Sequence, residues 1–155
     1  VTAHRAENVD NKASLQGIVD ALNYISSEYK VIFSVHPRTR SRLFSMGISA
    51  NIVLSEPFGL FDFVKMEQTA KVTISDSGTV QEECCIFKVP SITIRRTTER
   101  HETIWGGSNI LTCTNAGNII DAFEAILRRE STWEPPEDYL VANVSDTVIN
   151  ILLGR

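Results

Sequence analysis

The chain lacks any run of apolar residues long enough to cross a lipid bilayer, and no stretch of it has the pattern of a signal peptide. It has little cysteine: the 3 cysteines include the adjacent Cys84 and Cys85, and they show neither a disulfide framework nor the spacing of zinc ligands. It also lacks an excess of basic residues, since its net charge is -4. These absences argue against a membrane protein, a nucleic-acid scaffold and a metal site, and they favour a reducing, cytoplasmic setting.

What is present is the composition of an ordinary globular domain. Hydrophobic residues make up 43% and charged residues 22% of the 155 residues, a length sufficient for one domain with its own core. The chain begins with Val1 instead of methionine, and residues 1–3 have the character of the last residues of a strand. We therefore expect a piece of a longer protein, in which upstream residues supply part of the active site.

Apolar residues recur at helical and strand spacings in alternation along the chain. The pattern predicts helices at residues 12–28, 39–46, 60–69, 80–87, 98–105, 119–129 and 144–153, with Asn115 placed to cap the sixth. It predicts strands at residues 31–35, 51–54, 71–74, 91–94 and 109–112. Such alternation is typical of an α/β fold with a Rossmann-like, doubly wound parallel sheet that carries helices on both faces.

A small polar turn, Ser-Asp-Ser-Gly-Thr, lies between the fourth predicted strand and the helix that follows it. Free N–H groups at the helix start, the hydroxyl of Ser77 and close backbone approach at Gly78 suit a bound anion. Glu82 and Glu83 lie one helical turn further, within reach of the hydroxyls of an attached sugar. The alternative is a capping box, in which Ser77 or Thr79 is the N-cap and one of the two glutamates reaches back to a free N–H.

Polar residues also follow the other predicted strands at the points where they end. In a doubly wound sheet these carboxyl ends share one edge, and ligands bind there. The residues gathered at this edge are His4, Arg5, Glu7, His36, Arg38, Phe58, Gly59, residues 76–78 and residues 95–100. Each one has an ordinary structural explanation, such as a backbone hydrogen bond, a strand end or a solvated surface. Their joint placement favours a site for an anionic ligand.

Several of these segments resemble one known family. Residues 1–8, 35–37, 76–83 and 97–100 are similar, in order and spacing, to the carboxyl-terminal half of the non-hydrolysing UDP-N-acetylglucosamine 2-epimerases. The resemblance covers essentially the whole chain. It implies that residues 1–155 form a single Rossmann-like UDP-binding domain, one half of a glycosyltransferase-B-type two-domain architecture whose amino-terminal domain is missing from this chain. It also implies a homodimer for the full-length protein.

The resemblance implies a reaction without a cofactor or metal ion. UDP leaves the sugar by anti elimination to give a 2-acetamidoglucal, and it then adds back to the opposite face, which inverts C2. UDP-N-acetylglucosamine and UDP-N-acetylmannosamine are thereby interconverted. Proton transfer in this family is attributed mainly to carboxylates of the amino-terminal domain. The isolated chain is therefore expected to bind UDP and to be inactive.

The family pattern assigns Arg100 and five further residues of this chain to UDP. Ser77 and Gly78 would contact the phosphates, and Glu83 would accept hydrogen bonds from the ribose hydroxyls. Phe63 would lie against the uracil, and the backbone near Phe58 would read the edge of the base.

Charged residues of the same pattern would surround the diphosphate. His4 is the candidate catalytic residue, acting by stabilising charge, and Arg100 would add positive charge near the cleft. Arg5, Glu7 and His36 match positions that contribute to a second, regulatory UDP-sugar site in some bacterial members.

Some positions depart from the commonest family pattern. Thr79 stands where many members have a second glycine, and His101 stands where proline is usual. Residues 36–40, 56–59 and 143–146 are closer to relatives that act on UDP-2-acetamido-2,6-dideoxy-L-talose, which is therefore an alternative substrate. A glycosyltransferase of the same architecture and a non-enzymatic nucleotide-sugar binder remain further alternatives. The terminal helix resembles a segment that crosses back to pack on the other domain.

Overall fold

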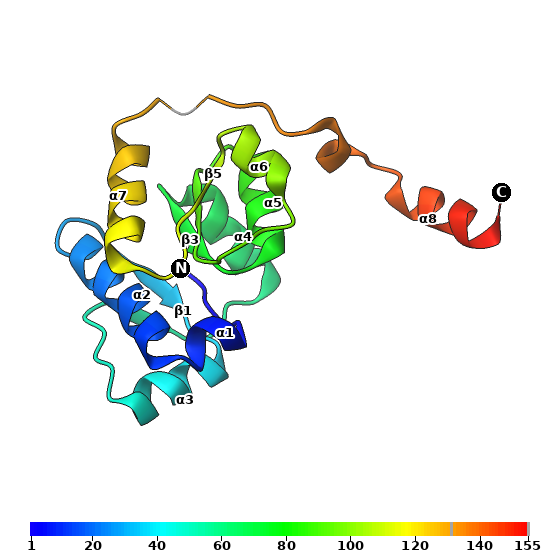
Figure 1. The fold of residues 1–155 in the computed structure, drawn as a ribbon. Coiled ribbons are helices and arrows are strands. Elements are labelled where there is room, and N and C mark those ends of the chain that lie inside the picture. Colours follow the sequence, from blue (N-terminus) through cyan, green and yellow to red (C-terminus); the bar gives the residue numbers. More distant parts are fainter. Residues whose placement is uncertain (131, 155) are drawn as a thin grey trace.

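The computed structural model of the chain describes residues 1–130 and 132–154 (Figure 1). Short parallel strands alternate with helices, as the sequence predicts. The strands are β1 (Ile32–Ser34), β2 (Val53–Ser55), β3 (Thr73–Ser75), β4 (Ser91–Thr93) and β5 (Asn109–Leu111). The helices are α1 (Ala6–Val9), α2 (Lys12–Ile25), α3 (Pro37–Met46), α4 (Leu60–Thr69), α5 (Gly78–Phe87), α6 (His101–Trp105), α7 (Ala116–Leu127), the 3-10 helix η1 (Glu137–Leu140) and α8 (Val144–Leu153).

The first residues of the chain join two groups of parallel strands. β1 pairs with β2, and β3, β4 and β5 pair in that order. Between the groups, Ser34 N–H donates to the Val1 carbonyl at 3.0 Å, and Thr2 N–H donates to the Ile74 carbonyl at 3.1 Å. Thr2 also forms an isolated parallel bridge with Ser75. With this segment counted as the first strand, the order is 3-2-1-4-5-6, which is that of a doubly wound Rossmann sheet.

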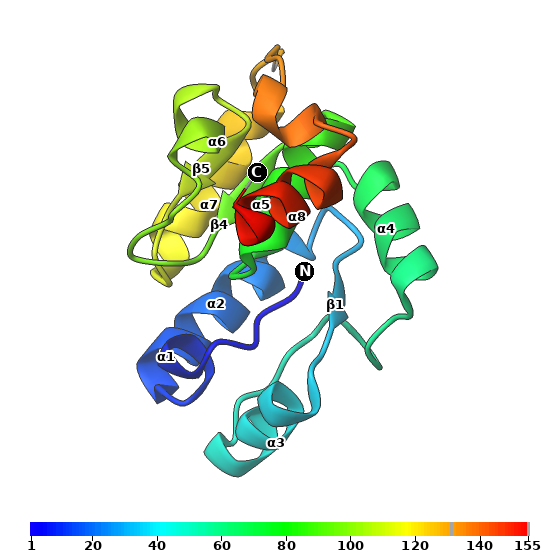
Figure 2. The same ribbon diagram turned by 90° about the vertical axis from the view of Figure 1, so that its right-hand side faces the viewer.

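Helices cover both faces of the strands, and each face has its own apolar cluster. α2, α3 and α7 lie on one side, and α4, α5 and α6 lie on the other (Figures 1 and 2). The larger cluster includes Leu15, Ile18, Phe33, Ile92 and Ile119. The smaller cluster includes Phe63, Val80, Cys84, Phe87 and Val89. Fully burying one such side chain contributes about 1.5–3 kcal/mol, so these clusters stabilise the arrangement that positions the strand ends.

The three cysteines are free, and Cys113 is exposed. Cys84 and Cys85 are buried and unpaired. Burial raises the pKa of the Cys84 thiol to about 12, so this thiol has little nucleophilic character. Within residues 1–130 and 132–154, no helix is long and apolar enough to span a membrane.

The predicted helices and strands are confirmed, with small shifts at their ends. α6 begins at His101 and not at residue 98, because the Thr98 hydroxyl accepts the Arg100 N–H at 3.1 Å and holds a turn before the helix. Asn115 is the N-cap of α7, and its side chain accepts the Asn118 N–H. The short α1 and η1 were not predicted; each is a single turn without a hydrophobic period to reveal it.

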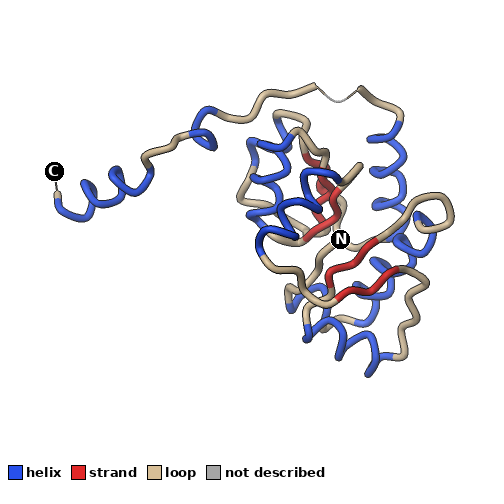
Figure 3. The backbone as a smooth tube through the Cα atoms, turned by 180° about the vertical axis from the view of Figure 1, so that it is seen from behind, coloured by secondary structure: helices blue, strands red, loops and turns tan. Residues whose placement is uncertain are grey.

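The carboxyl-terminal segment leaves the body of the domain. η1 contacts α5, but α8 extends away from the sheet, as both sides of the molecule show (Figures 1 and 3). None of the residues of α8 is buried. Its exposed apolar side chains are Val144, Val148, Ile149, Ile151, Leu152 and Leu153. Packing of this helix on a second domain stays a prediction.

Candidate functional site

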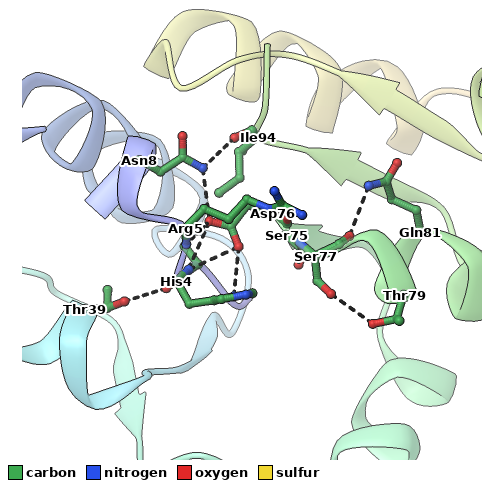
Figure 4. A network of polar contacts seen from close by, with 11 residues as sticks. His4, Arg5, Asn8, Thr39, Ser75, Asp76, Ser77, Thr79, Gln81 and Ile94 are labelled. Carbon is green, nitrogen blue, oxygen red and sulfur yellow. Dashed lines mark hydrogen bonds and ion pairs between the residues drawn. The ribbon is translucent and has the colours of Figure 1, made fainter. Parts of the chain in front are cut away.

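The candidate site lies where the strand order reverses. The first strand segment ends at Ala3, and its neighbour β3 ends at Ser75. The chain then turns into His4 and Arg5 on one side and into Asp76 on the other, so these three residues meet (Figure 4). This is the position at which doubly wound sheets bind ligands.

Asp76 is the centre of this junction. Its carboxylate has no exposed surface and accepts the backbone N–H of His4 at 3.0 Å and that of Arg5 at 2.9 Å. The Asn8 side chain donates to the same carboxylate at 3.1 Å and to the Ile94 carbonyl at 3.0 Å. Asp76 therefore joins the ends of two strands and the start of α1. Sequence reasoning included it in the polar turn but assigned it no role.

His4 is held in place by Asp76. Its Nδ1 lies 3.1 Å from Asp76 Oδ1, and its side chain is 45% exposed. The hydrogen bond to Asp76 is the main cause that raises the pKa of His4. Burial alone would raise the pKa of Asp76, but the hydrogen bonds from His4, Arg5 and Asn8 outweigh it and lower that pKa. Both shifts favour the ion pair, in which a protonated His4 imidazolium lies beside an ionised Asp76 carboxylate at the rim of the junction.

The turn after Asp76 leads into α5 without a side-chain cap. Ser77 is the N-cap residue, yet its hydroxyl makes no capping bond and instead lies 3.0 Å from the Thr79 hydroxyl. Neither glutamate reaches back to the turn, since Glu82 Oε1 accepts Arg100 Nε at 2.6 Å and Glu83 lies against Glu67. The capping-box interpretation is therefore wrong. The first N–H groups of α5 remain available to an anion.

Arg100 brings positive charge to the same helix start. A Cβ atom built on Gly78 would lie 3.5 Å from Arg100 Cζ, so the guanidinium packs against the glycine. Nε is used by Glu82, and within the described residues no acceptor takes the two terminal nitrogens. These nitrogens can bind an anion that also reaches the N–H groups of α5. The structure thus brings Ser77, Gly78 and Arg100 together, and their contact with a diphosphate stays a prediction.

The residues assigned to uridine are Phe58 in the loop before α4, Phe63 in α4 and Glu83 in α5. Phe58 and Phe63 are partly buried and line one side of a cavity of about 280 Å³. Glu83 lies near Glu67, a residue that sequence reasoning missed. Burial and the Glu83 carboxylate raise the pKa of Glu67 to about 8, and burial raises the pKa of Glu83. Glu83 is therefore one member of a carboxyl pair.

The three residues assigned to a second site make no hydrogen bond or ion pair with one another within the described residues, and their role there stays a prediction. Arg5 Nε donates to the Asp76 carbonyl at 2.8 Å, which ties this side chain to the main junction. The rings of His36 and His4 are 6.3 Å apart, but His36 is the N-cap of α3 and accepts the Arg38 N–H. Glu7 is exposed in the first turn of α1. Within residues 1–130 and 132–154, no group of three or more His, Cys, Asp or Glu side chains is placed to hold a metal ion.

Comparison with known proteins gives one consistent family. A family model described as UDP-N-acetylglucosamine 2-epimerase matches residues 1–153. The UDP-N-acetylglucosamine 2-epimerase of Methanocaldococcus jannaschii is 43% identical over 144 residues, which are 88% of this chain and 39% of that protein. The UDP-2,3-diacetamido-2,3-dideoxy-D-glucuronate 2-epimerase of Pseudomonas aeruginosa is 34% identical over 122 residues, 78% of this chain and 34% of that protein.

A solved structure agrees with the sequence comparison. The crystal structure of the Methanocaldococcus jannaschii UDP-GlcNAc 2-epimerase in complex with UDP-GlcNAc and UDP is 39% identical and superposes with a TM-score of 0.89. The match covers 99% of this chain and 44% of that chain. This chain therefore spans less than half the length of the relatives it matches.

Proposed function

This chain belongs to the UDP-N-acetylglucosamine 2-epimerase family, and on that basis we propose that it is the UDP-binding domain of an enzyme that interconverts UDP-N-acetylglucosamine and UDP-N-acetylmannosamine. The observation that carries the proposal is the junction at the strand reversal. Three groups of donors lie around the turn at Ser77: the His4 side chain held by Asp76, the first N–H groups of α5, and the terminal nitrogens of Arg100. Such a set of donors suits a diphosphate.

These donors have a direct chemical use in the proposed reaction. When the bond between C1 of the sugar and the diphosphate breaks, negative charge accumulates on the leaving phosphate oxygens. Donors that are already oriented towards those oxygens stabilise this charge more than they stabilise the substrate. His4, Ser77 and Arg100 would do so from three directions. Glu83 would hold the ribose, and Phe58 and Phe63 would contact the base.

Removal and return of the proton at C2 require an acid and a base near the sugar. In this proposal those groups lie in an amino-terminal domain of the full-length protein, and the active site is the cleft between the two domains. The proposal includes a cytoplasmic homodimer for the full-length protein. Sedimentation of that protein with and without UDP would test the dimer.

The test of the reaction uses the full-length protein in deuterated water with UDP-N-acetylglucosamine. Elimination and re-addition predict solvent deuterium at C2 together with the epimerised product, both visible by proton NMR. Transfer of the sugar to an acceptor without inversion at C2 would instead identify a glycosyltransferase. UDP binding without exchange on any UDP-sugar would identify a non-enzymatic binder.

A second substrate is worth testing in the same assay, because the Pseudomonas aeruginosa relative is named for a different UDP-sugar. Residues 36–40, 56–59 and 143–146 resemble relatives that act on UDP-2-acetamido-2,6-dideoxy-L-talose, so this compound is the second substrate to test. Exchange at C2 of the deoxytalose compound alone would replace UDP-N-acetylglucosamine as the substrate and leave the 2-epimerase chemistry unchanged.

The role of His4 has its own kinetic test. In the full-length protein, His4→Ala should lower kcat by about 10²–10³-fold, as is typical for one lost donor to a developing charge, and change KM much less. A parent-like kcat would remove His4 from the catalytic residues.

A further inference from the structure

A buried amide lies directly behind the proposed diphosphate turn and has no role in the chemistry described above. Gln81, in α5, is 1% exposed. Its Nε2 donates to the Ser77 carbonyl at 3.1 Å (Figure 4). Its Oε1 accepts the Thr98 hydroxyl at 2.6 Å and the Asn109 side-chain amide at 3.1 Å. One side chain therefore connects the turn, the segment before α6 and strand β5.

These contacts continue to both backbone groups of Arg100. The Thr98 hydroxyl, which donates to Gln81, accepts the Arg100 N–H at 3.1 Å. On the other side, the Thr103 hydroxyl accepts from Asn109 at 3.1 Å and donates to the Arg100 carbonyl at 2.7 Å. The Thr98 hydroxyl thus holds the backbone N–H of Arg100, and the Thr103 hydroxyl holds its carbonyl. Each hydroxyl both donates and accepts one hydrogen bond in these contacts.

We call this set of side chains the Gln81 network; its members are Gln81, Thr93, Thr98, Thr103 and Asn109. All five are at most 5% exposed. The orientation of Asn109 is set, because its Oδ1 accepts the Thr93 hydroxyl at 2.8 Å. Because the members satisfy one another, and an unpaired polar group in the interior is costly, this arrangement is strongly favoured over any rearrangement.

The network fixes only the backbone of Arg100, and a second contact directs its side chain. Nε donates to Glu82 at 2.6 Å, and the guanidinium carbon lies against Gly78. With the backbone and Nε both held, the two terminal nitrogens keep one position over the first turn of α5. A free arginine side chain would lose much more conformational freedom on binding an anion.

We propose that the Gln81 network positions Arg100 over the first turn of α5 and thereby sets the affinity of this site for the diphosphate of a nucleoside diphosphate. This inference rests on the proposed function. Gln81, Thr98 and Thr103 act here as positioning residues that do not touch the ligand.

A matched pair of variants at Thr98 tests the inference. Thr98→Val keeps the shape and removes the hydroxyl, whereas Thr98→Ser keeps the hydroxyl. The Kd for UDP is measured with this chain by calorimetry, and that for uridine, which lacks phosphate, by NMR titration. Thr98→Val should weaken UDP binding about fivefold, the effect of one lost hydrogen bond, and leave uridine binding unchanged. Thr98→Ser should bind both ligands like the parent.

A double-mutant cycle with Arg100→Ala shows whether Thr98→Val weakens UDP binding through the position of Arg100 or by destabilising the fold in general. In the Arg100→Ala background, Thr98→Val should cause no further loss of UDP affinity, because the side chain it positions is gone. An equal loss with and without Arg100, or an equal loss for UDP and uridine, would overturn the inference. If Thr98→Val does not fold, as judged by circular dichroism, Thr103→Val and Thr103→Ser make the same comparison from the other side of Arg100.

The outcomes also separate this inference from the proposed function. If the parent chain binds neither UDP nor UDP-N-acetylglucosamine, the proposed function fails. If the parent binds UDP and Arg100→Ala weakens that binding while neither valine variant does, only the positioning role is overturned.

Discussion

Among the described residues, two side-chain carboxyl groups are almost completely buried, and they behave in opposite ways. Asp76, at the end of β3, has no exposed surface and accepts hydrogen bonds from His4, Arg5 and Asn8; its pKa is lowered. Glu67, near the end of α4, is 3% exposed, and within the described residues neither of its carboxyl oxygens has a hydrogen-bond partner. Its pKa is raised to about 8.

The difference shows that donors, more than burial, decide the charge of a buried carboxyl. Burial by itself raises the pKa of both groups. At Asp76 the donors reverse this effect, and they do so while joining two strand ends and α1. At Glu67 only the charge of the Val1 amino group opposes this effect, without reversing it, and the second carboxyl, Glu83, adds to it. Asp76, at the end of β3, is therefore ionised and already holds its donors in place before any ligand binds. Glu67, in α4, is protonated instead.

The largest effect on stability should come from removing the Asp76 carboxylate. Asp76→Ala leaves two backbone N–H groups and the Asn8 amide without their acceptor, so it should lower the free energy of unfolding by about 3–5 kcal/mol. Urea denaturation followed by circular dichroism measures this loss. Asp121→Ala, on the exposed side of α7, is the control and should change stability by less than about 0.5 kcal/mol. A small loss at Asp76 would mean that the junction does not depend on it.

Glu67, the buried carboxyl without a hydrogen-bond donor, should make the free energy of unfolding depend on pH. Because folding raises the pKa of Glu67, its contribution to stability is fully present below the ordinary value of 4.5 and is lost as pH rises through about 8. The buried Val1 amino group, whose pKa is lowered to about 6, acts in the opposite direction over this pH range, so the effect of Glu67 is taken as the difference between the parent and Glu67→Gln. We expect this difference to change by about 2 kcal/mol between pH 5 and pH 9, since one pKa unit corresponds to about 1.4 kcal/mol and Glu83 shares part of the shift.

Glu67→Gln should remove this loss, and Glu28→Gln at an exposed position should not. Urea denaturation of the three proteins across this pH range makes the comparison. The two buried carboxyls would then limit stability at opposite ends of the pH range. Glu67 lowers stability at high pH, whereas the contribution of Asp76, whose pKa is lowered, disappears only as pH falls below 3.8. A Glu67→Gln variant with the pH dependence of the parent would contradict the assignment of a neutral Glu67.

The link between the carboxyl pair and the ligand can be tested at Glu83. Glu83→Gln should weaken UDP binding about tenfold, because a carboxylate that accepts ribose hydroxyls is replaced by a neutral amide. The same variant should bind 2′,3′-dideoxy-UDP like the parent does, since that ligand lacks both hydroxyls. Calorimetry with the two ligands gives this comparison. Equal losses for both ligands would show that Glu83 supports α4 and α5 and does not contact ribose.

The sequence predicted the fold better than it predicted these carboxyls, for a physical reason. The strands and helices follow from local spacing of apolar residues, as at α5 and α7, and the polar turn at Ser77 stands directly between two such patterns. Asp76 gains its role from residues that lie 68 to 72 positions away in the chain. Glu67 stands between Met66 and Gln68 in an ordinary amphipathic pattern, and only the packing of α4 on α5 buries it.

The smallest predicted effect concerns the histidine beside the paired carboxyl. The hydrogen bond to Asp76 is the main cause that raises the pKa of His4 above its ordinary 6.5. Asp76→Asn, which keeps the size of the side chain and removes its charge, should therefore lower that pKa. Proton–nitrogen NMR spectra of the imidazole rings across pH 5 to 9 measure it, with the ring signals of His101 in α6 as the internal reference. An unchanged titration midpoint of His4 would mean that a group other than Asp76 stabilises the proton on His4. The charge that we propose for stabilising the leaving diphosphate would then not depend on Asp76.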